Sequence, residues 1–342
     1  MKTPIYRVNS SAQISLVEHI DAVPWWLFDR LPQGFAGRVY ASQILKKHPE
    51  FSSDLRDWSD PVVLQLLSEY PVDAIGNLLI GDKDLKRYLV SENQPCPLAD
   101  LPQLAEHAKE FCQMLISGEQ PKFCCDIEQL GPCIVKFAET VHQADLLIAE
   151  HTALSILNDA GIPSVQTTLF RSGHYQFLVI RRFDCISSGR RGVVSLKALD
   201  LEFVGSKEQR WPVIASQLID QGVIAASALP TIQLLFCFGR LIANSDMHSG
   251  NLSFLDDGQM PFALAPAYDQ LPMAYASDRQ HISQITVDTD LPSSVWGHAL
   301  PLALRFWQEL AQQPLLSESF QIIAVQMLHS VQHAVAEQVG SV

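Results

Sequence analysis

Two short polar segments near residue 250 constrain this chain most, because each gathers acidic or amide side chains into a few residues. The first covers residues 244–251 (NSDMHSGN) and the second covers residues 265–269 (APAYD). An apolar helical run, residues 232–243, leads into the first segment, and a turn at residues 256–258 separates the two. We therefore expect both segments on loops that flank short strands, where site residues are usually mounted.

Asp246, Asn251 and Asp269 supply the groups that phosphoryl transfer from ATP requires. That reaction needs a carboxylate that orients and deprotonates the attacking hydroxyl, and oxygen ligands that hold magnesium against the phosphates. The three residues also follow one another in the order that kinases use them. The pattern therefore indicates the catalytic and metal-binding half of a kinase.

A lysine inside a short apolar strand indicates the other half. Residues 133–137 (CIVKF) are expected to form a strand, and Lys136 there needs an anionic partner. In the helix expected from about residue 143, Glu150 lies on the apolar stripe, where a carboxylate must be paired. A strand lysine paired with a helix glutamate is how kinases hold the phosphates of ATP. A purely structural ion pair, or a glutamate at the edge of the stripe, remains the alternative.

The order of the expected elements predicts an α+β chain with two lobes. A turn-rich loop at residues 117–123 leads into strands, and the segments 166–170 and 175–180 form a hairpin that ends at Arg182. From about residue 195 the apolar pattern is almost wholly helical. We expect a mixed β-sheet N-lobe at residues 1–183, with a phosphate loop near 115–123, and an all-helical C-lobe at residues 184–342.

Charge and hydropathy narrow the class of protein. A net charge of −13 argues against broad, direct binding to nucleic acid. The N-terminus lacks the apolar core of a signal peptide, and the longest apolar run, residues 232–243, is too short to span a bilayer. The seven cysteines show no Cys-x-x-Cys spacing, which favours reduced thiols. The sequence predicts a cytoplasmic protein that does not enter a membrane.

With these pieces in order, the sequence resembles the HipA-like kinase family, and most of all its short HipT-type and YjjJ-type members. The resemblance runs from about residue 35 to residue 310. Five segments carry it: a phosphate loop at 117–123, an ATP-lysine strand at 135–137, a hinge at 182–184, and catalytic and metal motifs at 246–251 and 266–269. One such match is weak, whereas five in the right order are specific.

The resemblance implies a two-lobed protein-kinase-like fold and a serine/threonine kinase that uses ATP and Mg²⁺. Asp246 would act as the base or orienter of the acceptor hydroxyl, and Lys136 would contact the α- and β-phosphates. The site residues that it implies are the catalytic residues Asp246 and His248, the metal ligands Asn251 and Asp269, and the cofactor-binding residues Lys136, Glu150, Ser117, Gly118, Arg182 and Phe183.

The resemblance also implies a biological setting. Family members act as toxins that arrest growth, and characterised ones phosphorylate an aminoacyl-tRNA synthetase. A small antitoxin protein and a helix-turn-helix antitoxin are the implied partners, and DNA would be reached only through the antitoxin. Two other functions stay open on the sequence alone: a kinase of a small molecule, and an inactive pseudokinase scaffold that binds a partner.

The phosphate loop departs from the family pattern, and Ser117 and His248 each admit a second interpretation. The phosphate loop has one glycine, Gly118, and Leu115 stands where short-type relatives often carry the first of two autophosphorylated serines. Ser117 remains an autophosphorylation candidate, or a serine that only shapes the turn. His248 either braces Asp246 or a phosphate, or it satisfies carbonyl groups of its own loop.

Overall fold

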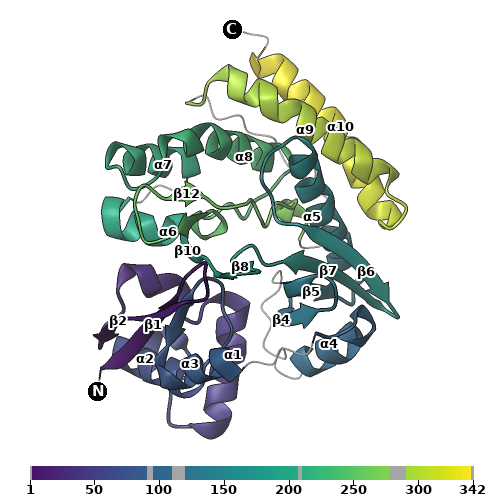
Figure 1. Ribbon diagram of the computed structural model, residues 1–342. Helices are drawn as coiled ribbons and strands as arrows, with labels where there is room; N and C mark the ends of the chain where they lie inside the picture. Colours follow the sequence, from purple (N-terminus) through teal and green to yellow (C-terminus); the bar gives the residue numbers. More distant parts are fainter. Residues whose placement is uncertain (1, 91–94, 110–119, 207–209, 277–289, 340–342) are drawn as a thin grey trace.

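The structure is a computed structural model that describes residues 2–90, 95–109, 120–206, 210–276 and 290–339. Three bodies are visible in Figure 1: a compact N-terminal body in purple and blue, a β-sheet with one long helix, and a group of helices that ends in yellow. The first two lie side by side below the helical group.

The N-terminal body, residues 3–90, has a core of its own. An antiparallel sheet in the order β2-β1-β3 packs against three helices. The elements are β1 (Thr3–Val8), β2 (Ile14–Ile20), α1 (Gly34–Lys47), α2 (Asp60–Glu69), β3 (Leu78–Ile80) and α3 (Gly81–Val90). Proline at the second position of α2 suits a helix start, as expected. Ile5, Leu27 and Leu64 are fully buried at the centre.

The second body is a four-stranded antiparallel sheet in the order β4-β5-β7-β6. It contains β4 (Lys122–Ile127), β5 (Gly131–Ala138), β6 (Thr167–Ser172) and β7 (Tyr175–Arg181), with α4 (Leu101–Lys109) and α5 (Val141–Asp159). Leu101 and Ala105 of α4 share a core with Phe137 and Phe177, whereas α5 packs on the opposite face. Because successive strand residues alternate between faces, Lys136 points to the side of α5, as predicted.

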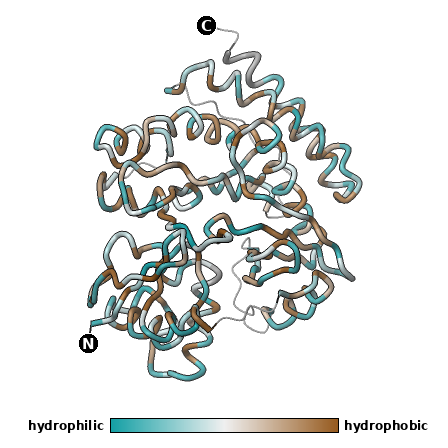
Figure 2. Tube along the Cα trace, in the orientation of Figure 1, coloured by the Kyte–Doolittle hydropathy of each residue, from teal (hydrophilic) through white to brown (hydrophobic). Residues whose placement is uncertain are grey.

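The third body is mainly helical, around a core that includes three fully buried tryptophans. It contains α6 (Leu196–Leu199), α7 (Trp211–Asp220), α8 (Leu229–Leu241), α9 (Ser293–Gln312) and α10 (Glu318–Val339). Apolar and polar stretches alternate along α9 and α10, as expected for helices with one buried side (Figure 2). Among the helices in the described ranges, none has both the length and the apolar character needed to cross a membrane.

The expectation of an all-helical C-lobe was wrong in one detail. The region also holds two hairpin-like strands, β8 (Cys185–Ile186) and β9 (Gly189–Arg190), and a sheet of β10 (Gly192–Ser195), β11 (Ser253–Asp256) and β12 (Ala263–Leu264). Strands of two to four residues are too short to show a period of two in the sequence. The small sheet matters, because β11 begins just after the first polar segment and β12 ends directly before the second.

Candidate active site

Lys136 and Glu150, both buried, meet Asp269, whose side chain is 27% exposed, in one cluster. The Lys136 Nζ donates hydrogen bonds to both carboxylate oxygens of Glu150, each at 2.8 Å. It also makes an ion pair with Asp269 from the second polar segment. Lys136 is 6% exposed and Glu150 is completely buried. The predicted lysine–glutamate pair is therefore present, and the structure adds Asp269 as a second partner that the sequence did not indicate.

The cluster holds one positive side chain, Lys136, and two acidic ones, Glu150 and Asp269. Burial raises the pKa of Glu150 to about 7, and the negative charge of Asp269 adds to this effect against the attraction of Lys136. Burial also disfavours ionisation of Asp269, but Lys136 and Lys122 outweigh it and lower the pKa of Asp269 to about 2. With both carboxylates ionised, one lysine faces two negative charges. The excess negative charge and the oxygen ligands fit a divalent cation such as magnesium.

Asn244 joins the two polar segments, a role that we did not predict. Its Oδ1 accepts a hydrogen bond from the backbone N–H of Asp246 (3.1 Å), and its Nδ2 donates to the carbonyl oxygen of Asp269 (3.3 Å). Asn244 is 4% exposed. Ala243 and Asp269 both have positive φ, at 59° and 51°, a conformation that non-glycine residues adopt rarely and mostly where the surroundings impose it. The side chain of Asn244 therefore fixes the relative position of the two loops.

The loop that carries Asp246 presents free oxygen atoms. The Nδ2 of Asn251 donates to the carbonyl oxygen of Asp246 at 2.8 Å, which turns Asn251 back over the loop. Within the described ranges, no hydrogen bond reaches the Oδ1 of Asn251, and the exposed carboxylate of Asp246 takes part in no hydrogen bond or ion pair. These groups could receive a cation and a hydroxyl proton, and their predicted roles stay predictions.

The ring of His248 contacts its own loop, but through a backbone N–H and not through the carbonyl groups that the second interpretation expected. Its Nδ1 accepts a hydrogen bond from the backbone N–H of Gly250 at 3.0 Å, so the ring caps its own turn. Its carbonyl oxygen accepts from the indole of Trp211 at 3.1 Å. Neither contact involves Asp246. The catalytic role of His248 remains a prediction without a contact to support it.

The hinge residues Arg182 and Phe183 have different partners: Arg182 contacts carboxylates, and Phe183 contacts an aromatic ring. Arg182 is buried and bonds Asp184 through Nε (3.0 Å) and Nη2 (2.6 Å), and it also pairs with Asp73 of the N-terminal body. These contacts turn Arg182 away from the Lys136 cluster, so they give no support to its predicted cofactor-binding role. The ring of Phe183 instead stacks on Tyr268, with centroids 6.5 Å apart and planes at 20°.

Two predicted positions cannot be placed. Ser117 and Gly118 lie outside the described residues, so their predicted roles in phosphate binding and autophosphorylation stay predictions. The structure describes the end of the predicted phosphate loop from Gln120, where the chain enters β4. Lys122 at the start of β4 is exposed and pairs in register with Lys136 on β5.

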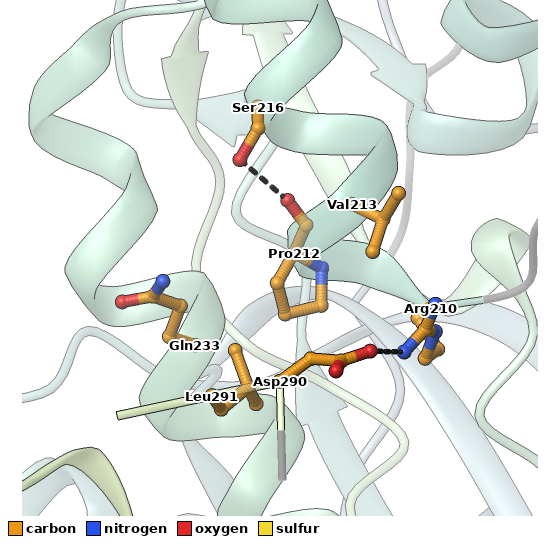
Figure 3. Close-up of a pocket in the computed structure, with 7 residues that line it drawn as sticks. All are labelled: Arg210, Pro212, Val213, Ser216, Gln233, Asp290 and Leu291. Carbon is orange, nitrogen blue, oxygen red and sulfur yellow. Dashed lines mark hydrogen bonds and ion pairs between the residues drawn. The ribbon is translucent and has the colours of Figure 1, made fainter. Parts of the chain in front are cut away.

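A small pocket lies between α7, α8 and residues 290–291, and Lys136 is not among its lining residues. Its volume is about 150 Å³, and Figure 3 shows its lining residues: Arg210, Pro212, Val213, Ser216, Gln233, Asp290 and Leu291. An ion pair of 2.7 Å between Arg210 and Asp290 crosses one side. Trp211, which bonds the carbonyl of His248, lies between two lining residues in the sequence. Pockets for cofactors usually exceed about 300 Å³, so this pocket suits one side chain.

The raised pKa of Glu150 predicts a pH dependence of stability. Its pKa is 4.5 for an ordinary glutamate and about 7 in the fold, so the folded protein holds the proton more tightly between these values. The free energy of unfolding should therefore fall, through this group, as pH rises from 4.5 to 7. Asp269 acts with the opposite sign and only below pH 3.8, outside that window.

We expect Glu150→Gln to remove this dependence. Urea unfolding at pH 5 and at pH 7 should give a smaller difference in the free energy of unfolding for Glu150→Gln than for the wild type. Glu128→Gln, a change at an exposed glutamate, is the matched control and should behave like the wild type. An unchanged difference in Glu150→Gln would contradict the assignment of the buried proton to Glu150.

Two family models match this chain, and a curated relative is similar to most of it. The model of the HipA-like C-terminal domain matches residues 114–338, and the model of the YjjJ-like toxin middle domain matches residues 3–89. Toxin YjjJ of Escherichia coli (strain K12) is 35% identical over an alignment of 350 positions, gaps included, which covers 94% of this chain and 77% of that protein.

One solved structure has the same fold over nearly the whole chain. HipA of Shewanella oneidensis MR-1, in a complex with HipB and its operator DNA, aligns over 98% of this chain and 89% of its own, with a TM-score of 0.62 and 15% identity. The Helicobacter pylori proinflammatory kinase CtkA aligns over 63% of this chain and 94% of its own, with a TM-score of 0.48 and 16% identity. From the two family models and the curated relative, the chain belongs to the HipA-like toxin family, with a YjjJ-like middle domain, and its α+β fold is that of HipA.

Proposed function

We propose that this chain is an ATP- and Mg²⁺-dependent protein serine/threonine kinase that acts as a HipA-type toxin. The observation that carries the proposal is the cluster of Lys136, Glu150 and Asp269, in which one ammonium group faces two carboxylates. A structural ion pair would need one partner for each charge, whereas a site with excess negative charge beside exposed oxygen ligands suits a cation and a nucleotide.

Each residue has a role in this proposal. Glu150 fixes the Lys136 ammonium, which would contact the phosphates, and Asp269 and Asn251 would hold magnesium. Bound magnesium would neutralise charge on the phosphates. The exposed carboxylate of Asp246 would orient the acceptor hydroxyl and take its proton. Phe183 would lie against the nucleotide at the hinge, where we place the boundary between an N-lobe of residues 1–183 and a C-lobe of residues 184–342.

Two comparisons support the biological role that we propose. A relative that is 35% identical bears the name of a toxin, and a HipA of the same fold was solved with HipB and operator DNA. We propose that the chain arrests growth in the cytoplasm by phosphorylating a translation component, such as an aminoacyl-tRNA synthetase. An antitoxin would neutralise it, and the net charge of −13 favours contact with DNA only through that partner. Ser117 is the proposed site of autophosphorylation.

Transfer of labelled γ-phosphate to proteins of a bacterial lysate tests the function. With purified chain, ATP and Mg²⁺, we expect label on a small number of proteins, and phosphopeptide mapping should place it on serine or threonine. Label that remains soluble in acid and elutes with metabolites would identify a small-molecule kinase instead. No transfer to any acceptor, together with no binding of ATP, would identify an inactive scaffold and contradict the proposal.

A further inference from the structure

A loop of the N-terminal body is bonded directly to the hinge. The Nη2 of Arg182 donates to the carbonyl oxygen of Ala74 at 2.9 Å, and the same guanidinium group pairs with Asp73. The carboxylate of Asp184 accepts from the backbone N–H of Gly76 at 2.9 Å. Arg182 and Asp184, which flank Phe183 in the sequence, therefore both bond to the segment 73–76.

Burial makes these contacts necessary for the hinge. The side chains of Arg182 and Asp184 are each 1% exposed. A buried charge that loses a partner costs far more than an exposed one, because water cannot replace the lost bonds. Arg190 also reaches Asp73, at 3.3 Å, so this carboxylate is shared by two arginines of the hinge region. Without segment 73–76, the buried Arg182–Asp184 pair would lose its bonds to Asp73, to the Ala74 carbonyl and to the Gly76 N–H.

The hairpin after the hinge rests on the same body. The backbone N–H of Arg190 donates to the carbonyl oxygen of Asn9 at 3.1 Å. A Cβ atom at Gly189 would lie 2.2 Å from that same oxygen, so the two backbones touch too closely for a side chain. The contact between the N-terminal body and the hinge is therefore extended and closely packed.

Phe183 connects this contact to the loop of Asp246. Its ring stacks on Tyr268, and the Tyr268 hydroxyl donates to the carbonyl oxygen of Gly250 at 3.0 Å. The same hydroxyl lies 2.6 Å from the Oγ of Ser253. Tyr268 directly precedes Asp269 and touches the loop that holds Asn251. A continuous series of contacts thus runs from Asp73 through the hinge to both polar segments.

We propose that Asp73 is a positioning residue of the kinase site, and that the N-terminal body controls nucleotide affinity by holding the hinge. This inference rests on the proposed function. Asp73 anchors Arg182, the Arg182–Asp184 pair sets the hinge, and the hinge keeps Phe183 on Tyr268. A partner that moves segment 73–76 would weaken nucleotide binding without touching the nucleotide site.

Titration calorimetry with Mg²⁺ and the non-hydrolysable ATP analogue adenylyl imidodiphosphate tests the proposal on the full chain. Asp73→Asn is expected to raise the Kd about tenfold, a typical size for coupling between two sites. Arg190→Gln removes only one of the contacts of Asp73 and should raise the Kd less, which keeps the test open if Asp73→Asn does not fold. Asp54→Asn is the matched control, because Asp54 pairs with Arg56 on the exposed side of the same body.

A double-mutant cycle separates positioning from general destabilisation. If the effect passes through Phe183, Asp73→Asn should change the Kd little once Phe183→Leu is present. Equal Kd values for the wild type, Asp73→Asn and Arg190→Gln in folded protein would overturn the proposal, as would additive effects in the cycle. A wild type that does not bind the analogue would refute the kinase function itself, so the two failures are distinguishable.

Discussion

Asp246→Asn is expected to reduce phosphoryl transfer by about a thousandfold, the size typical of a lost general base. Asparagine keeps the shape of the side chain but cannot take a proton. Stability should not change, because the bonds that Asp246 makes to Asn244 and Asn251 use only its backbone N–H and carbonyl groups. The loss should therefore appear in the rate and not in the fold.

The measurement is the initial rate of label transfer from γ-labelled ATP, beside the thermal unfolding midpoint of each variant. Asp257→Asn is the matched control, because Asp257 is an exposed aspartate on the nearby turn at residues 256–258. We expect wild-type rates from it. An Asp246→Asn variant that keeps more than a tenth of the wild-type rate would remove Asp246 from the reaction.

Lys136→Met is expected to have the second large effect, on stability and activity together. The change leaves Glu150 fully buried and without its partner, and breaking a buried pair in this way costs about 3–5 kcal/mol. Activity should be lost as well, because no ammonium group would remain in the cluster to contact the phosphates. Urea unfolding at pH 8, where Glu150 is ionised in the wild type, gives the change in free energy.

A double variant separates the two effects. Lys136→Met with Glu150→Met removes the two most buried charges and leaves Asp269, whose side chain is 27% exposed and keeps contact with solvent. Most of the lost stability should return, since an apolar pair can replace a buried ion pair at little cost. Activity should stay absent in the double variant. If Lys136→Met were as stable as the wild type, the buried ion pair would not have the energetic role that we assign to it.

The sequence predicted the parts of the site that follow from local periodicity. The strand at Lys136 and the helix at Glu150 are regular elements, and in each the period places the charged side chain on an apolar face. Because an unpaired buried charge is costly, Lys136 and Glu150 on neighbouring elements were expected to pair. Periodicity of apolar residues also predicted the hairpin at residues 166–180 and the helices after residue 195 near the positions where the structure has them.

Other parts of the site could not be predicted in this way. The contact of Lys136 with Asp269 joins residues 133 positions apart, and Asp269 lies in a loop without a period. The role of Asn244 depends on a positive φ at Ala243, and nothing in a run of apolar residues signals that angle. Asp73 and Arg182 are charged residues of two loops, and only the docking of two separately folded bodies brings them together.

The most direct test of the proposed kinase site is label transfer from γ-labelled ATP by wild-type and Asp269→Asn chains over a titration of Mg²⁺ in one lysate. We predict transfer by the wild type that rises with Mg²⁺ and stops when the metal is chelated, and no transfer by Asp269→Asn at any concentration. Transfer that is independent of Mg²⁺, or equal transfer by Asp269→Asn, would contradict the assignment of the Lys136, Glu150 and Asp269 cluster as a magnesium-dependent phosphoryl-transfer site.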